Sequence, residues 1–184
     1  MKDKYSALIQ NEYETSRGDS LRLFQVLLEI SVETGLDRAL AYLEACVIEK
    51  RLAWLDRNRD QIKITGNPVK DGYSLFYESY LGLSVHRDGD ILVDTSGKMV
   101  TRWWNRCPTL DACQKLGLDT RVICKKAYER PVQALLSRFH AGLQFERNYG
   151  CIRPYQPYCE EIIMLDEPGS RISTGVQDGP ASTP

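Results

Sequence analysis

The sequence has no apolar run that approaches the ~20 residues needed to span a bilayer, and its first twenty residues lack the apolar core of a secretion signal. Positive and negative charges nearly balance, with a formal net charge of −1. No strong overall field therefore attracts the chain to nucleic acid or to an anionic membrane. We expect a cytoplasmic protein without nucleic-acid or membrane partners, in which thiols stay reduced.

Established catalytic motifs are also missing. The chain has no glycine-rich phosphate loop, no G-x-S-x-G nucleophile elbow and no H-E-x-x-H zinc motif. Its two histidines, His86 and His140, have no neighbours that indicate catalysis or metal binding, so we interpret both as structural. The chemistry has to come from other side chains, and the six cysteines are the first candidates.

The length and composition fit one globular domain. A chain of 184 residues, 42% hydrophobic and 27% charged, is long enough for one proper core and short for two. We assign the domain to residues 19–165. Residues 1–18 are polar and unpatterned, so we expect a flexible N-terminus. From residue 166 to 184 the chain is rich in Gly, Pro, Ser and Thr, and it has too little apolar surface to order itself.

Hydrophobic side chains recur at helical spacing through the first half of the domain. Asp19 or Ser20 can cap a first helix, Gly35 ends it, and a second amphipathic stripe starts at Leu36. Pro68 suits the first position of a third helix. The aromatic residues of that helix lie at i, i+3, i+4 and i+7, which favours packing into the core: Tyr73, Phe76, Tyr77 and Tyr80.

After Gly82 the hydrophobic pattern changes to alternation, with turn signals at RDGD and TSGK. The alternating segments predict five strands, near 83–87, 90–94, 98–105, 142–149 and 159–165. A helix over 109–116 and a longer one that kinks or restarts at Pro131 separate the third strand from the fourth. The sequence thus predicts an α+β fold, with N-terminal helices followed by an antiparallel sheet that carries a helical insertion.

The most informative cysteine is Cys107, which follows a predicted strand and precedes Pro108. It lies at, or just before, the N-terminus of a helix, and the helix dipole favours the thiolate there. Arg102 and Arg106 would act in the same direction. The alternative is that Cys107 is simply a small residue that fills a strand-to-helix corner.

A metal site is a further alternative. The spacing Cys-x5-Cys-x10-Cys contains no C-x2-C pair of the kind found in structural zinc sites. A late cysteine that opens the last strand would meet Cys107 across the sheet. Four sulfurs would then surround an unidentified metal: Cys107, Cys113, Cys124 and Cys159. Without such a site we expect no cofactor.

Two acidic and two basic residues complete the set of candidates. Glu160 and Glu161 are adjacent on a strand, so at most one of them faces any pocket. Arg147 on the preceding strand, or Arg153 in the proline-rich loop IRPYQPY, can hold a carboxylate through a bidentate pair.

The segment from about Arg102 to Leu165 resembles the L-2-amino-thiazoline-4-carboxylic acid hydrolase-like family. The shared features are the RCP corner after a strand, LGLDTR with a cysteine just after it, LQFERNY and a terminal YCEEI. They extend over about a third of the chain. The family pattern has an aspartate and aromatic residues after the late cysteine, whereas this chain has CEEIIML.

The resemblance implies a hydrolase that opens a small cyclic amidine carboxylate with water, acting on a non-peptide C–N bond. It implies that Cys107 attacks or orients the ring, and that Glu160 or Glu161 moves protons. We expect four residues to hold the substrate: Arg102, Trp104, Arg147 and Cys159. The second class of function is a cysteine-based module that binds or senses a metal or a small ligand without turnover. In both cases the partner is a small molecule.

Overall fold

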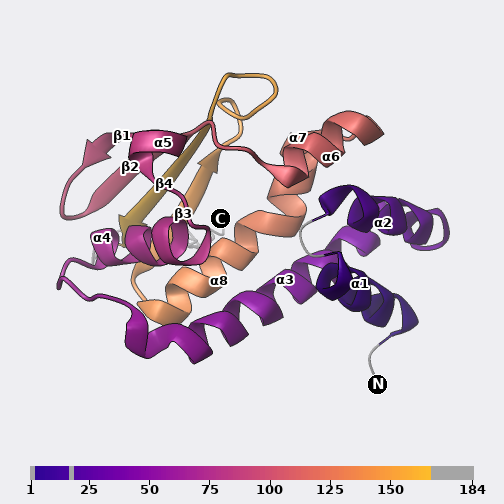
Figure 1. Ribbon diagram of the computed structural model, residues 1–184, viewed down its shortest axis with the longest axis horizontal. Helices are drawn as coiled ribbons and strands as arrows, with labels where there is room; N and C mark the ends of the chain where they lie inside the picture. Colours follow the sequence, from indigo (N-terminus) through magenta and orange to yellow (C-terminus); the bar gives the residue numbers. More distant parts are fainter. Residues whose placement is uncertain (1–2, 17–18, 167–184) are drawn as a thin grey trace, which may run out of the picture.

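The computed structural model describes residues 3–16 and 19–166 (Figure 1). The N-terminal helices are α1 (Lys4–Thr15), α2 (Ser20–Thr34) and α3 (Leu36–Asn58), followed by the 3-10 turn η1 (Arg59–Gln61). A helical segment of α4 (Pro68–Tyr73) and the π-helical η2 (Ser74–Tyr80) leads to α5 (Val85–Asp88). A second helical group lies between strands β2 and β3: α6 (Pro108–Leu116), α7 (Thr120–Ile123), the π-helical η3 (Cys124–Glu129) and α8 (Arg130–Phe139).

Four strands form one antiparallel sheet in the order β1-β2-β4-β3: β1 (Gly89–Asp94), β2 (Lys98–Trp103), β3 (Leu143–Asn148) and β4 (Cys159–Leu165). The predicted α+β class, with helices first and a helical insertion in an antiparallel sheet, is confirmed. Because side chains alternate along a strand, one face of this sheet carries the apolar residues and the other faces outward. The buried face includes Met99, Trp103, Phe145 and Ile163.

Residues 83–87 are an exception, because they were predicted as a strand and instead lead into the short helix α5. The backbone N–H of Ser84 donates to Asp88 Oδ2 at 2.9 Å, and the N–H of Asp88 donates to the Ser84 carbonyl at 2.7 Å. These local hydrogen bonds close a helical turn and compete with the sheet for the same backbone groups.

The expectation of a flexible N-terminus is wrong for residues 4–15, which form α1. Asp3 caps this helix by accepting from the Tyr5 N–H at 3.4 Å. Ile9 is fully buried among residues of α2 and α3. One buried side chain in a polar stretch gives almost no periodic signal, which is why the pattern alone did not indicate the helix. Residues 17–18 and 167–184, and thus nearly all of the predicted tail, lie outside the described residues.

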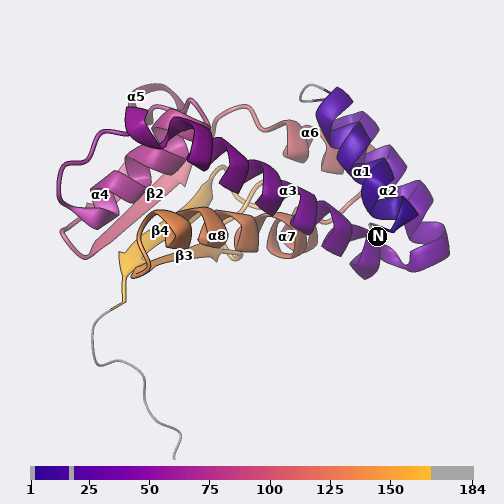
Figure 2. The ribbon, with the colours of Figure 1, turned by 90° about the horizontal axis from the view of Figure 1, so that it is seen from below.

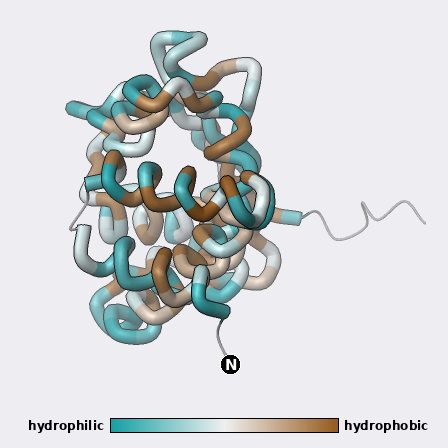
Figure 3. The backbone as a smooth tube through the Cα atoms, turned by 90° about the vertical axis from the view of Figure 1, so that its right-hand side faces the viewer, coloured by the Kyte–Doolittle hydropathy of each residue, from teal (hydrophilic) through white to brown (hydrophobic). Residues whose placement is uncertain are grey.

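The helices cover the sheet on one face. Figure 2 shows α8 between α3 and the strands, and contacts of α8 with both α3 and β3 agree with that view. Brown and teal stretches alternate along the helical turns in Figure 3, as expected for helices with one buried side. Within the described residues, no helix is both long and apolar enough to cross a membrane.

The buried side chains form two clusters. The first joins α1, α2, the first half of α3 and α6, and the second joins the sheet, α4, η2, α8 and the end of α3. With 23 residues, α3 is about 34 Å long and reaches both clusters. The two clusters therefore share one helix as their common support.

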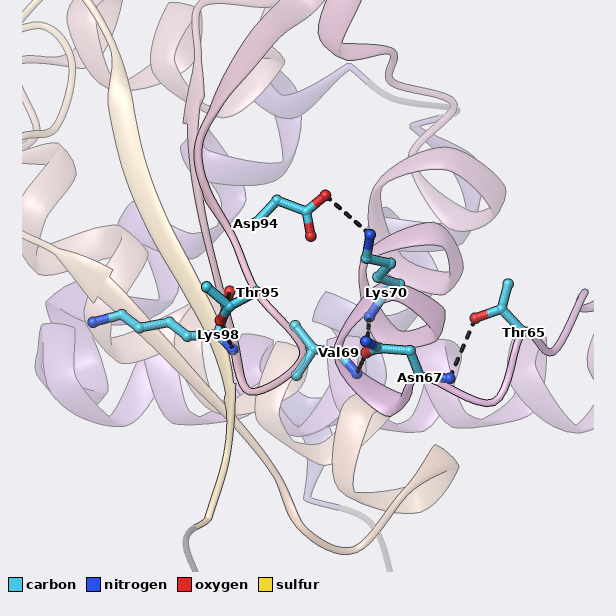
Figure 4. Close-up of polar contacts among 7 residues, drawn as sticks. All are labelled: Thr65, Asn67, Val69, Lys70, Asp94, Thr95 and Lys98. Atoms are coloured by element: carbon cyan, nitrogen blue, oxygen red, sulfur yellow. Dashed lines mark hydrogen bonds and ion pairs between the residues drawn. The ribbon is translucent and has the colours of Figure 1, made fainter.

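The start of α4 shows how the chain fixes a helix against the sheet edge (Figure 4). Asn67 Oδ1 accepts from the backbone N–H groups of Val69 and Lys70 at 3.0 and 3.1 Å, and Pro68 occupies the first turn as the sequence predicted. Lys70 Nζ then pairs with Asp94 Oδ2 of β1 at 3.0 Å. The cap orients α4, and through it η2, over the buried face of the sheet.

Replacing Ile9 by alanine tests whether α1 is part of the fold. Ile9→Ala should lower the free energy of unfolding by about 2–5 kcal/mol, because it removes a fully buried side chain and leaves a cavity. Leu8→Ala is the matched control: Leu8 is its neighbour in α1 but is 51% exposed, so a change within about 0.5 kcal/mol is expected. Urea unfolding followed by circular dichroism measures both. Equal effects of the two substitutions would contradict a docked α1.

Candidate functional site

A cavity of about 510 Å³ opens between the two clusters of buried side chains. Its walls come from both sides: Leu23 belongs to the first cluster, whereas Phe76 and Trp103 belong to the second. The corner between β2 and α6 and the adjoining ends of β3 and β4 close it at the sheet. The volume lies in the range of about 300–1,000 Å³ typical of small-molecule sites.

Both π-helical segments contribute to the wall of this cavity. The residues involved are Phe76, Tyr77 and Tyr80 from η2, with Cys124 and Tyr128 from η3. A π-turn holds an extra residue and changes the direction of the side chains, and such turns are frequent at functional sites. The predicted core role of the aromatic helix is confirmed for Phe76 and Tyr77, which are buried. Their second role as cavity wall was missed, because aromatic spacing alone does not distinguish the two.

A buried ion pair lies at the sheet end of the cavity. Arg147 donates through Nη2 and Nε to Glu161 Oε1 at 2.5 and 2.7 Å, and the Tyr77 hydroxyl donates to Glu161 Oε2 at 2.8 Å. Burial and the Glu161 charge raise the pKa of Tyr77 well above its usual value, so its hydroxyl stays a donor. Burial alone would lower the pKa of Arg147, but Glu161 holds it well above its usual value. Both oxygens of Glu161 are thus occupied.

Glu160 lies on the opposite face of β4, as the alternation predicted. Its oxygens pair with Arg102 Nε at 3.2 Å and accept from Asn148 Nδ2 at 2.9 Å. Arg102 also covers the ring of Tyr158 at 4.3 Å. Three residues expected at the site are therefore not among those lining the cavity, because they point outward from the sheet or lie past its end: Arg102, Trp104 and Glu160. Trp103 takes the place expected for Trp104, which is 47% exposed.

Cys107 does lie on the cavity wall, at the N-cap of α6 with Pro108 in the first turn. Burial raises the pKa of the Cys107 thiol, while the backbone N–H groups of Leu110 and Thr109 and the charge of Arg153 lower it. The first effect is larger, so the thiol is protonated at neutral pH. Arg153, rather than Arg102 or Arg106, is the cation that acts on the sulfur.

The four sulfurs proposed as metal ligands do not form a metal site. Cys124 and Cys159 line the cavity with Cys107, whereas Cys113 is fully buried in the first cluster. Burial raises the pKa of both Cys113 and Cys124 to about 12. Over residues 3–16 and 19–166, no group of three His, Cys, Asp or Glu side chains has a metal-binding arrangement.

Three arginines on the wall have buried polar atoms without partners among the described residues, and Nη1 of Arg147 is one of these atoms. Arg153 donates through Nη1 to the Asn105 carbonyl at 2.6 Å, but its Nε is buried and unpaired. Arg51 of α3 is 7% exposed, and its Nε and Nη1 have no hydrogen-bond partner among the described residues. Arg153 was expected from the sequence as a carboxylate-binding residue, whereas Arg51 was not. The burial of Arg51 could have been predicted from the sequence, because Val47, Arg51 and Leu55 follow one another at four-residue spacing on the buried stripe of α3.

Comparisons of the chain with protein-family models, with curated proteins and with solved structures gave no match. The site is therefore interpreted from its own geometry: a small-molecule cavity with one paired carboxylate, three arginines that are buried or half-buried, and a thiol at a helix N-terminus.

Glu161 and Glu160 provide a matched pair for testing the buried ion pair. Glu161→Gln should lower the free energy of unfolding by about 3–5 kcal/mol, because it leaves the Arg147 charge buried without compensation. Glu160→Gln affects a more exposed pair on the other face of the same strand, so a loss of about 1 kcal/mol or less is expected. Urea unfolding measures both, and a smaller loss for Glu161→Gln would argue against the buried pair.

The raised pKa of Cys107 predicts a specific pattern of alkylation. Because only the thiolate reacts, labelling of Cys107 in the folded protein should be slower at pH 8 than in urea-unfolded protein, and it should still accelerate above pH 9. Iodoacetamide labelling followed by peptide mass mapping measures the rate at each pH. Faster labelling in the folded state at neutral pH would mean that the helix N-terminus and Arg153 outweigh burial.

Proposed function

We propose that the cavity is the active site of a hydrolase that acts on a non-peptide C–N bond of a small cyclic amidine carboxylate. The observation that supports this most is the position of Cys107: its sulfur faces a small-molecule cavity from a helix N-terminus, with Arg153 beside it. The resemblance of residues 102–165 to the L-2-amino-thiazoline-4-carboxylic acid hydrolase-like family supports the same substrate class.

The geometry suggests how a protonated thiol can act there. The amidine nitrogen of the substrate takes the proton of Cys107 while Sγ adds to the amidine carbon, and the C=N electron pair moves onto nitrogen. The exocyclic amino group then re-forms a C=N bond to the same carbon and passes a proton to the ring nitrogen, so that the ring C–N bond breaks and this nitrogen leaves as a neutral amine. Water adds to the same carbon, the C–S bond breaks, and a proton from the water restores the thiol. The net reaction consumes one water molecule.

In this scheme the amidine nitrogen of the substrate acts as the base, because both carboxylate oxygens of Glu161 already accept hydrogen bonds. Its two oxygens bind Arg147 and Tyr77, so its role is to fix these groups in the wall. Glu160 lies on the other face of the sheet. The N–H groups at the start of α6 are placed to stabilise negative charge that develops near Sγ.

The second candidate, a module that binds or senses a small ligand without turnover, is favoured by one observation. The pKa of Cys107 is raised by burial rather than lowered, which is unusual for a catalytic thiol. No disulfide joins the described cysteines, which fits a reducing compartment, and we place both candidates in the cytoplasm on that basis.

Incubation with 2-amino-2-thiazoline-4-carboxylate tests the proposal, with the product detected by mass spectrometry as substrate plus one water. Cys107→Ser should reduce the rate at least about 100-fold, because a serine hydroxyl is a far weaker nucleophile than a thiol. Serine is also a preferred N-cap, so α6 should keep its stability. Cys151→Ser, outside the cavity lining, is the control and should keep full activity.

Equal rates for wild type and Cys107→Ser would contradict the nucleophile role. Saturable binding of the compound without any hydrolysis would favour the second candidate.

A further inference from the structure

We propose that Arg51 is the residue that binds the carboxylate of the ligand, a role that the sequence analysis assigned to other arginines. The inference rests on the proposed function for the ligand class, and it names a part of the cavity that the chemistry at Cys107 does not use. The central observation is a guanidinium that is 93% buried on the cavity wall, with two N–H-bearing atoms lacking partners.

A buried cation in this state is costly unless something compensates it. Its Nε and Nη1 are shielded from water and make no hydrogen bond within the described chain. Burial lowers the pKa of Arg51, and the neighbouring groups with the largest effects on it are Tyr80, Tyr13 and Arg147, none of which is a carboxylate. A folded protein that keeps such a group in a cavity has a place for an anion.

The surroundings of Arg51 favour a carboxylate over a more strongly hydrated anion. The guanidinium carbon lies 5.3 Å from the centre of the Phe76 ring and 5.5 Å from that of Tyr80, so two aromatic rings fix its position. The planar fork of an arginine matches a carboxylate through two parallel hydrogen bonds. One singly charged anion leaves the aromatic wall free to contact the rest of a small organic ligand.

The other two arginines are less suited to this role. Arg147 directs Nε and Nη2 to Glu161, which neutralises its charge and leaves only Nη1 without a partner. Arg153 uses Nη1 to hold the Asn105 carbonyl at the corner that positions Cys107. Arg51 acts from α3, whereas Arg147 belongs to β3 and Arg153 to the loop that follows it. Arg51 and Cys107 line the same cavity, so one small ligand can contact both.

Two ligands that differ only in the carboxylate test this assignment. Binding of 2-amino-2-thiazoline-4-carboxylate and of 2-amino-2-thiazoline is measured by calorimetry in Cys107→Ser protein, where turnover does not consume the ligand. The acid should bind on the order of 100-fold more tightly than its analogue. Adding Arg51→Met should bring that ratio close to one. Arg51→Lys should retain part of it, because the charge remains but the fork is lost.

Arg138→Met is the control, since Arg138 lies in α8 with its side chain 58% exposed and outside the cavity lining; the ratio should not change. Circular dichroism of each variant shows whether it is folded. If the acid still binds about 100-fold more tightly than its analogue after Arg51→Met, the assignment is overturned. It is also overturned if the two compounds bind equally well to the Cys107→Ser protein that retains Arg51. Absence of binding, together with no shift of Tm in acetate or benzoate, overturns it as well. Binding through Arg51 without hydrolysis by wild type would contradict only the proposed reaction.

Discussion

The buried pair of Arg147 and Glu161 is the interaction on which the cavity depends. It joins β3 to β4 across the sheet and holds the hydroxyl of Tyr77, whose ring lies 4.5 Å from that of Trp103. The sheet, the π-helical segment η2 and the end of β2 are thereby fixed relative to one another. Charges buried at this depth stabilise the fold only when both members are present, so the pair acts as a constraint on the geometry of the wall.

The other two buried or half-buried arginines of the cavity wall, Arg153 and Arg51, have different roles. Arg153 holds the corner that contains Cys107, and Arg51 presents from α3 a guanidinium in which Nε and Nη1 lack partners. In the proposed arrangement, Cys107 supplies the sulfur that reacts with or contacts the ligand, and Arg51 supplies the positive charge that binds its carboxylate. The proposed arrangement would give a protein with balanced overall charge an interior site that selects for anions.

Much of the fold could be predicted because its elements follow simple periods. The alternating strands, the α2 and α3 stripes and the cap at Asn67–Pro68 all leave a local signal in the sequence. The opposite orientations of Glu160 and Glu161 also follow from alternation. The sequence could not indicate α1, whose burial rests on Ile9, or α5, which depends on hydrogen bonds between Ser84 and Asp88. Nor could it place Arg51 and Cys107 on the wall of one cavity, since that requires the tertiary packing of α3 with the rest of the fold.

The two π-helical segments have a consequence for how the site can vary. Each accommodates one more residue per turn than an α-helix, and each lies on the cavity wall with a regular helix on at least one side. Loss of a single residue within such a segment would restore regular α-geometry and change which side chains of the segment face the cavity, whereas the helix that follows would keep its orientation because the π-turn had absorbed the extra residue. Specificity at this cavity can therefore change through one-residue insertions and deletions, which are ordinarily harmful inside a helix, while the sheet and its ion pair stay as they are.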